Sequence, residues 1–340
     1  MARPPGGGDD APGAAGNPQA TPIVVDGVMY LPVRGHQVLA LEADTGRELW
    51  RTTLPAPLDS TARGVAYWPG DGKVAPRILL TAAATLVALD ARTGAPVEGF
   101  GTHGVAQIGV PWNGVPLIFA DRAILGATTG EVALAEPGDT RAFDVRTGKL
   151  EWTFHTVPLP GERGHDSWLD QGWRNRSGVN VWAWYMTLDE RRGALYMPVG
   201  SAAGNYWGGD RPGANLFGNS IVALDAATGQ QIWQWGRPRT PGLVSDPSLG
   251  TNRGVAILGD NLFFVTDNAH LLALNRITGR LVWETVMWDE PQKYGGTVAP
   301  LIVKDMVVAG VSGGDWGIRG FLAAYHAGTG ERLWRHWTVP

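Results

Sequence analysis

The sequence predicts an all-β fold, a β-propeller built from four-stranded antiparallel blades. Three observations lead to this prediction: a recurring turn motif, strand-like segments around each copy, and an excess of turn residues and tryptophan. The 340-residue chain contains 48 Gly, 24 Pro and 16 Trp. Gly and Pro at this level favour many tight turns, and so many Trp favour a packing role that is repeated along the chain.

The recurring motif has the form A-x-D-x-x-T-G-x-x-x-W and occurs six times with substitutions. Successive copies start 48, 54, 81, 50 and 51 residues apart. Repeats of this length with four short strands each are typical of β-propellers, and the long third spacing indicates an insertion within residues 153–222. The copies are ALEADTGRELW from Ala40, ALDARTGAPVEGF from Ala88, AFDVRTGKLEW from Ala142, ALDAATGQQIW from Ala223, ALNRITGRLVW from Ala273 and AYHAGTGERLW from Ala324.

Residues 22–52 illustrate one repeat. Two apolar segments flank Asp26-Gly27, which is the strongest short signal for a β-hairpin. Two further segments flank the EADTG turn, so the unit contains four strands. In each copy the Asp or its substitute can bind the turn backbone, and the Gly accepts a positive φ. The Trp, which is present in five of the six copies, can fill the space between stacked sheets. No segment shows convincing helical periodicity.

Composition excludes several classes of function. The chain has no Cys, which excludes disulfides, thiolate zinc sites, a Cys nucleophile and covalently attached haem. The net charge of −4 gives no indication of nucleic-acid binding, and no apolar run reaches the length of a transmembrane segment. Residues 1–20 are rich in Gly, Pro and Ala, lack the apolar core of a signal peptide and are expected to be disordered. Residues 21–340 are expected to form the propeller.

The repeats resemble the tryptophan-docking repeats of the dehydrogenases that depend on pyrroloquinoline quinone (PQQ). The resemblance covers nearly all of residues 20–340. It implies a propeller, with eight blades in that family, that holds PQQ and Ca²⁺ and oxidises sugars or alcohols. The most specific stretches are RGVAYW (63–68), AFDVRTGKLEWTFHTVPLPGERGHDSW (142–168), SGVNVWAWYMTLDERRGALYMPVG (177–200), GGDRPGANLFGNSIVALDAATG (208–229) and SGGDWGIRGFLAAY (312–325).

The resemblance implies four contacts to the quinone. Arg63 in RGVA and Arg253 in NRGVA match an arginine that binds it, and a guanidinium suits a cofactor with three carboxylates. Trp168 in GHDSW resembles the tryptophan on which the quinone ring stacks. Thr297 in GGTVAP resembles a further quinone contact. Trp168 is equally consistent with a packing role in the core.

It also implies a Ca²⁺ site and a general base. Asn180 in GVNVW, Glu131 in TTGE and Asp315 in SGGD resemble amide and carboxylate ligands, which are the oxygen donors that Ca²⁺ selects. Asp225 in IVALD resembles the catalytic base beside the metal and is also expected to be one of the metal ligands. It is expected to take the substrate hydroxyl proton while hydride passes to the quinone. Each residue also has a structural interpretation, since Asp225 occupies a turn position of the repeat, Asn180 can cap a turn and Glu131 can be a solvated loop carboxylate. Asp210 in GGDR is a second acidic candidate.

Two further positions refine the resemblance. Relatives that use lanthanides carry a second Asp two residues after the base, where this chain has Ala227, so Ca²⁺ is expected. Thr251-Asn252 stand where alcohol-oxidising members have a Cys pair, which favours the glucose-dehydrogenase-like subgroup.

The chain departs from the family in its number of repeats. Six units are recognisable, and residues 63–158 and 253–340 read as two copies of one two-blade module. The sequence is therefore interpreted as incomplete or rearranged, or as a smaller ring. A family lysine near the quinone carbonyl has no match.

Two other functions remain open. The repeat also occurs in an outer-membrane assembly lipoprotein, so a non-catalytic scaffold for protein–protein interaction, or an inactive fragment, is the main alternative. A propeller hydrolase or lectin is disfavoured, because no Ser/His/Asp spacing supports it. For the enzyme, the resemblance implies a sugar or alcohol substrate, a quinone or cytochrome c as electron acceptor and a periplasmic location.

Overall fold

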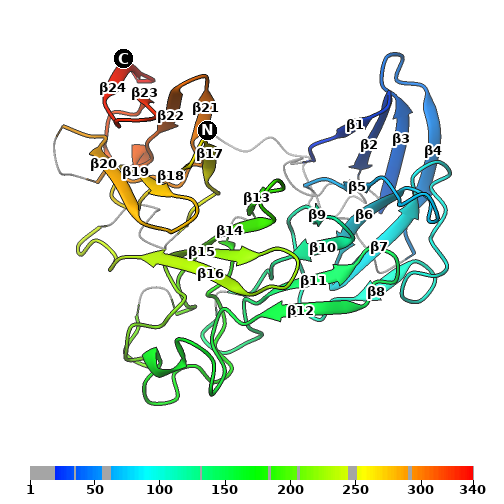
Figure 1. The fold of residues 1–340 in the computed structure, drawn as a ribbon, viewed down its shortest axis with the longest axis horizontal. Coiled ribbons are helices and arrows are strands. Elements are labelled where there is room, and N and C mark those ends of the chain that lie inside the picture. Colours follow the sequence, from blue (N-terminus) through cyan, green and yellow to red (C-terminus); the bar gives the residue numbers. More distant parts are fainter. Residues whose placement is uncertain are drawn as a thin grey trace, which may run out of the picture. The chain divides into compact units, whose positions relative to one another are not determined.

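The computed structural model describes residues 20–33, 36–55, 63–130, 132–182, 185–204, 207–243, 251–289 and 293–339. These residues form six four-stranded sheets, each made of strands that are consecutive in the sequence (Figure 1). The predicted all-β fold of four-stranded antiparallel blades is therefore confirmed. The proposed disordered segment, up to residue 19, lies outside the described residues.

The strands alternate with short turns throughout. The first three sheets contain β1 (Ile23–Val25), β2 (Val28–Val33), β3 (Gln37–Glu42) and β4 (Glu48–Thr53); β5 (Ala66–Trp68), β6 (Arg77–Ala82), β7 (Thr85–Asp90) and β8 (Val105–Gln107); and β9 (Leu117–Phe119), β10 (Arg122–Leu125), β11 (Thr140–Asp144) and β12 (Leu150–Phe154). The last three contain β13 (Thr187–Asp189), β14 (Ala194–Val199), β15 (Ser220–Asp225) and β16 (Gln231–Gly236); β17 (Ala256–Leu258), β18 (Asn261–Val265), β19 (His270–Asn275) and β20 (Leu281–Val286); and β21 (Leu301–Val303), β22 (Met306–Gly310), β23 (Phe321–His326) and β24 (Arg332–Trp337). Two short 3₁₀ turns are η1 (His165–Ser167) and η4 (Gly314–Trp316). No helix in the described ranges is long and apolar enough to cross a membrane.

The chain divides into two compact units. The first contains residues 1–125 and 142–151, and the second contains residues 126–141 and 152–340. The boundaries fall within the third sheet, whose β11 and β12 contribute residues to both units. Each unit has its own apolar core between successive sheets. One core cluster includes Val38, Ile78 and Leu89 in the first unit, and others surround Leu272 and Tyr325 in the second.

The hairpin at Asp26-Gly27 forms as the sequence predicts. Val25 pairs with Val28, and both turn residues have positive φ, 49° and 77°. A two-residue turn with φ positive at both positions matches the twist of the flanking strands.

The recurring motif forms the turn between the third and fourth strands of a blade. In the fifth sheet, Asn275 Oδ1 accepts hydrogen bonds from the backbone N–H groups of Ile277 and Thr278 at 3.1 and 2.9 Å, and from Thr278 Oγ1 at 3.0 Å. Asp90, Asp144 and Asp225 make the same three bonds in their own blades. The Asx position of the motif is thus a turn former.

Three of the motif's tryptophans donate a hydrogen bond to the next blade, whereas the buried Nε1 of Trp152 has no partner among the described residues. Trp283 Nε1 donates to Ala327 O at 3.1 Å, and Trp233 Nε1 donates to Arg276 O at 2.9 Å. In the first unit, Trp50 Nε1 donates to Ala91 O at 3.0 Å. Each acceptor is the residue directly after the Asx position of the following blade. The repeat therefore encodes both a turn and the interface that receives the preceding Trp.

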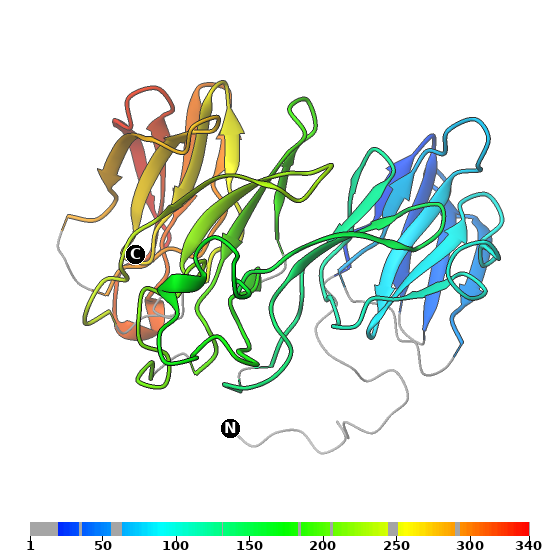
Figure 2. The same cartoon turned by 60° about the horizontal axis from the view of Figure 1, so that its bottom comes forward.

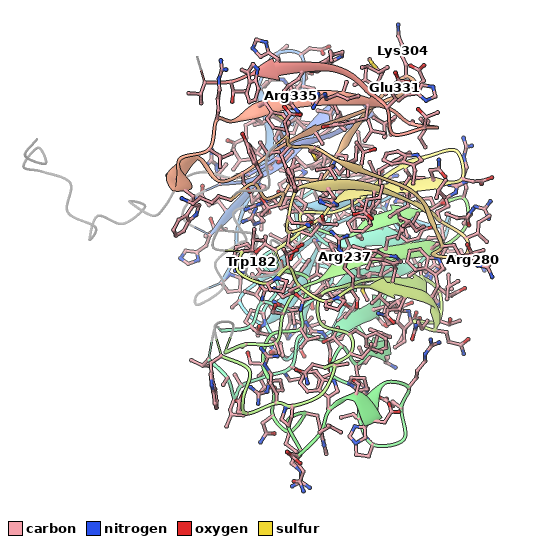
Figure 3. The ribbon with its side chains drawn as sticks, turned by 90° about the vertical axis from the view of Figure 1, so that its left-hand side faces the viewer. Trp182, Arg237, Arg280, Lys304, Glu331 and Arg335 are labelled. Atoms are coloured by element: carbon pink, nitrogen blue, oxygen red, sulfur yellow. The ribbon has the colours of Figure 1, made fainter. Side chains whose placement is uncertain are left out.

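Antiparallel pairing gives each blade two distinct edges. The turn edge carries the hairpin between the first two strands and the A-x-D-x-x-T-G turn. The connection edge carries the link between the second and third strands and the link to the next blade. In the second unit, Figure 3 shows Trp182, which precedes β13, at the opposite end of the strands from the turn residues Arg280, Lys304 and Glu331. Long insertions occur at the connection edge (Figure 2).

Candidate cofactor site

Loops at the connection edge of the second unit form an ordered cluster around Asn180. The segment 177–180 runs antiparallel to 200–203. Val179 N donates to Ser201 O and Gly200 N donates to Asn180 O, both at 2.9 Å, and Gly178 pairs with Ala202. This pairing extends the edge of the fourth sheet beyond the end of β14, and it fixes the backbone on which Asn180 stands.

The link between β10 and β11 packs against the same segment. Ser177 N donates to Ala133 O at 3.2 Å, and Ser177 Oγ donates to Gly130 O at 2.9 Å. Gly138 is necessary for the close approach, because a Cβ there would lie 2.3 Å from Gly178 O and 2.6 Å from Asn180 Cβ. Glu131 lies outside the described residues, so its prediction as a metal ligand remains a prediction.

The Asn180 side chain is buried, with 4% of its surface exposed. Its Nδ2 donates to Ala127 O at 2.9 Å. This bond sets the orientation of the amide, because only the nitrogen can donate. Oδ1 therefore lies on the side of the amide away from Ala127. A fixed amide oxygen of this kind is a suitable donor for a hard cation.

An ion pair between the buried Arg176 and the exposed Asp210 lies in the same loop cluster. Arg176 is 3% exposed, and its Nη1 donates to Asp210 Oδ2 at 2.9 Å. Arg176 also donates through Nε to Gly172 O at 3.0 Å. These contacts hold the Asp210 carboxylate in the link between β14 and β15, at the same edge as Asn180. Asp210, which the sequence suggested as a second acidic candidate, thus belongs to this cluster.

A buried carboxylate, Asp139, supports the link between β10 and β11. Asp139 Oδ1 accepts a hydrogen bond from Thr156 N at 3.0 Å. Burial raises the pKa of Asp139 above its ordinary value of 3.8, and the nearby His155 and the bond from Thr156 oppose this effect. Burial penalises the charged carboxylate more than these partners stabilise it.

The two tryptophans of this region differ in exposure. Trp168, the residue predicted to stack on the quinone, is 4% exposed, and its Nε1 donates to Leu216 O at 2.5 Å. Trp182 is 37% exposed, and its backbone N–H donates to Asn180 O at 2.9 Å. A ring needs an accessible face to receive a planar ligand, so Trp182 is better placed than Trp168. The signal for it was its position in GVNVW, two residues after Asn180.

Asp225 is not brought together with Asn180. It pairs with Ala194 at the turn edge of the fourth sheet, whereas Asn180 bonds to Gly200 beyond the other end of β14. Six residues of extended strand separate Ala194 from Gly200, a distance of roughly 20 Å. The expectation of Asp225 as a base beside a metal held by Asn180 is therefore not supported by this arrangement. Ala227 lies at the same turn edge, where its backbone N–H donates to Asp225 Oδ1 at 3.0 Å.

Arg253 and Thr297 are brought together at the connection edge of the last two blades. Arg253 N donates to Thr297 O at 3.0 Å, and Arg253 Nη1 donates to Thr297 Oγ1. Asp315 lies exposed in η4, in the link between β22 and β23. Arg63 belongs to the first unit, where its carbonyl accepts a bond from Thr21 N at 3.0 Å. Arg63 and Arg253 each precede the first strand of their blade.

Within the described ranges, no group of three or more His, Cys, Asp or Glu is arranged to hold a metal ion. A cation at Asn180 would therefore need amide or backbone oxygens besides carboxylates, or a ligand from outside those ranges.

Family profiles match almost the whole chain. The profile described as "Glucose/ethanol/alcohol dehydrogenase, beta-propeller domain" matches residues 6–236, and the profile of the outer membrane protein assembly factor BamB matches residues 217–339. The quinate/shikimate dehydrogenase (quinone) of Acinetobacter baylyi is 28% identical over 81% of this chain and 38% of its own length. The quinohemoprotein alcohol dehydrogenase ADH-IIG of Pseudomonas putida is 32% identical over 78% of this chain and 39% of its own length. The chain thus spans about two fifths of these relatives.

Solved structures agree with the fold. The quinohemoprotein alcohol dehydrogenase ADHIIG of Pseudomonas putida HK5 has a TM-score of 0.67 at 21% identity, over 93% of this chain and 66% of its own. A europium-containing methanol dehydrogenase has a TM-score of 0.68 at 20% identity, over 93% of this chain and 70% of its own. BamB from Moraxella catarrhalis has a TM-score of 0.54 at 18% identity, over 92% of this chain and 73% of its own. Because its first profile match covers most of the chain, this protein belongs to the family of PQQ-dependent glucose, ethanol and alcohol dehydrogenase β-propeller domains.

Proposed function

We propose that this chain forms the PQQ-binding part of a quinoprotein dehydrogenase that oxidises a hydroxyl group of a sugar, alcohol or hydroxy acid. The observation that carries the proposal is the buried, oriented amide of Asn180, two residues before Trp182, which is 37% exposed, in a chain of this family. A periplasmic location and a quinone or cytochrome c as electron acceptor are part of the same proposal.

The side chains at the connection edge include oxygen ligands that suit Ca²⁺ and an indole and a guanidinium that suit PQQ. The Asn180 amide oxygen suits Ca²⁺, and the Asp210 carboxylate, held by Arg176, is an acidic group in the same loops. Trp182 offers an indole face for a planar ring. Arg253 with Thr297 would contribute a guanidinium group that suits the quinone carboxylates, and Glu131 and Asp315 remain proposed carboxylate ligands. Arg63 lies in the first unit and stays a prediction from the sequence.

When bound, PQQ supplies a two-electron acceptor and Ca²⁺ supplies a Lewis acid. The chain's own residues would orient these groups. Asn180 holds one oxygen in a fixed direction, because its nitrogen bonds to Ala127 O. The residue that accepts the substrate proton must lie at the same edge as the cofactor, so Asp210 is the carboxylate to test as the base. Asp225, the base expected from the sequence, is the alternative.

The test is a titration of the purified chain with PQQ, with and without Ca²⁺, followed by tryptophan emission and by equilibrium dialysis. We expect PQQ to bind in a Ca²⁺-dependent manner. Asn180→Ala should weaken binding at least about tenfold, or about 1.4 kcal/mol, because it removes the fixed oxygen. Trp182→Phe should reduce the quenching more than Trp168→Phe does, because Trp182 has the accessible ring.

Asp225→Asn is the matched comparison for Asp210→Asn. An Asn at 225 can still accept the turn bonds, so this change should leave PQQ binding intact if Asp225 serves the turn alone. If Asp225→Asn lost Ca²⁺-dependent PQQ binding while Asp210→Asn kept it, Asp225 would belong to the cofactor site. That result would contradict its exclusion on the ground that it lies at the turn edge.

A scaffold function is the second candidate, favoured by the BamB profile match over residues 217–339. It predicts that the folded chain binds no PQQ at any Ca²⁺ concentration. In that case, capture of a defined protein partner through the propeller surface would replace the dehydrogenase proposal.

A further inference from the structure

A cavity lies at the connection edge of the fourth and fifth sheets, entirely within the second unit. It has a volume of about 80 Å³, and its walls include Arg239, Asn219, Asn252, Trp235 and Phe264. A cavity needs at least about 10–15 Å³ to hold one water molecule, so this one has room for a few waters. It therefore suits a small ligand rather than a tricyclic cofactor.

Arg239 is the unusual residue of this cavity. Burial lowers its pKa, and the charge of Asp267 opposes that effect. Its Nη1 donates to the hydroxyl of Ser201 at 3.1 Å, and Ser201 Oγ donates to Asn219 Oδ1 at 2.9 Å. Among the described residues Arg239 forms no ion pair. Asp267, which also lines the cavity, acts on this charge through space without bonding to it. A half-buried guanidinium is costly unless an anion pairs with it directly.

The other charged groups of the wall are already occupied. Arg237 donates to Glu284 Oε1 at 2.9 Å, to Thr266 Oγ1 at 2.9 Å and to Asn268 Oδ1 at 2.7 Å. Asp267 accepts bonds from Thr240 N at 2.9 Å and Thr240 Oγ1 at 3.2 Å. Arg239 is thus the cation whose charge faces the cavity without a carboxylate bonded to it among the described residues.

We infer that this cavity binds a small carboxylate, whose oxygens pair with Arg239 and whose body lies against Trp235 and Phe264. A guanidinium matches the two oxygens of a carboxylate in a bidentate pair. The two aromatic rings are in edge contact, with centroids 5.2 Å apart, and they form an apolar wall. This wall favours a carboxylate with a short apolar body over an inorganic anion such as phosphate, which has no apolar part.

The inference is independent of the proposed cofactor, because the ligand can be tested alone. Propionate is the probe, propionamide is its neutral analogue and inorganic phosphate is the competing anion. In calorimetric titration of the full chain without PQQ or Ca²⁺, propionate should bind saturably at one site. Propionamide should not bind measurably, and phosphate should bind more weakly than propionate.

Two substitutions locate the site. Arg239→Gln should weaken propionate binding at least about tenfold, which corresponds to about 1.4 kcal/mol. Arg239→Lys should retain part of the affinity, because it keeps the charge and loses the planar fork. Arg280→Gln is the matched control. It removes an arginine at the opposite, turn edge of the fifth sheet, where Figure 3 shows it far from Arg237, and it should leave binding unchanged.

Three results would overturn the inference. Equal binding of propionamide would show that no charge is recognised, and tighter binding of phosphate would exclude a carboxylate site. Unchanged propionate binding in Arg239→Gln, with the far-ultraviolet circular dichroism of the folded chain retained, would place the site elsewhere.

Discussion

At the scale of the residue, the glycine of the recurring motif has two separate constraints. Gly279 has a φ of +70°, and a Cβ there would lie 2.8 Å from Cδ2 and Cε3 of Trp233 in the preceding blade. The turn needs the left-handed conformation, and the interface needs the absence of a side chain. Gly330 stands in the same relation to Trp283, at 2.6 Å from Cε3.

Gly279→Ala should therefore destabilise the chain by about 2–5 kcal/mol, from backbone strain of about 1–2 kcal/mol and overpacking of about 1–3 kcal/mol. Gly259→Ala is its control in the same blade. Gly259 has a φ of +58° with nothing within 4 Å of a Cβ, so only the strain of about 1–2 kcal/mol applies. Urea unfolding of both variants measures the difference in their free energies of unfolding. Equal losses of stability would show that Trp233 moves away from the new methyl group without an energetic cost.

Asp139 makes stability depend on pH in a defined direction. Its folded-state pKa is raised by burial, so the unfolded chain loses this proton at a lower pH than the folded chain. Between pH 4 and the raised pKa the folded state then binds more protons, and stability falls as pH rises through this window. Arg141, His155 and Glu162 are the charged or titratable groups that act on it.

Asp139→Asn should remove this contribution, while its amide oxygen can still accept the bond from Thr156 N. We expect the variant to lose less stability than the parent between pH 4 and pH 7, as measured by urea unfolding. Asp71→Asn is the comparison, because the pKa of Asp71 is lowered in the folded chain whereas that of Asp139 is raised. Bonds from Val74 N, Arg146 and Lys73 N lower the pKa of Asp71 to about 2, so its contribution is lost only as pH falls below about 4. If the free energy of unfolding depended on pH in the same way in the parent and in Asp139→Asn, the raised pKa of Asp139 would be contradicted.

At the scale of the element, the interface between blades depends on one indole. Trp283→Phe removes the bond to Ala327 O and leaves that carbonyl without this donor, which should cost about 1–2 kcal/mol. Trp334 has the same motif position in the last blade, is 41% exposed and forms no indole bond among the described residues. Trp334→Phe should therefore change stability by less than about 0.5 kcal/mol. Thermal unfolding measures the stability of the two variants. Similar losses of stability would show that Trp334 packs against another surface.

The elements themselves were predictable from the sequence, because the Asp26-Gly27 hairpin and the motif's turns rely on local chemistry. The site was less predictable, since it depends on which end of a blade each residue occupies. Asp225 repeats the turn position of Asp90 and Asp144, and its register with Ala194 removes it from Asn180. Trp168 and Trp182 differ mainly in exposure, which is set by packing from loops distant in the sequence.

At the scale of the whole molecule, the two compact units and the two family profiles divide the chain differently. The units separate within the third sheet, between residues 125 and 152, whereas the two profiles overlap at residues 217–236. The two profile matches thus meet within the fourth sheet, inside the second unit. The fourth and fifth sheets remain joined by Trp233 and Arg276. Nearest-neighbour contacts of this kind are independent of the ancestry of each repeat.

The bond from a motif Trp to the following blade has a consequence for how such genes change length. Donor and acceptor lie 41 residues apart for Trp50 and Ala91, and 44 apart for Trp283 and Ala327. Duplicating or deleting a whole repeat recreates a complete donor–acceptor pair at each new junction. An insertion of half a repeat would separate a donor from its acceptor. An array of such blades therefore keeps its donor–acceptor pairs when its length changes in steps of one blade.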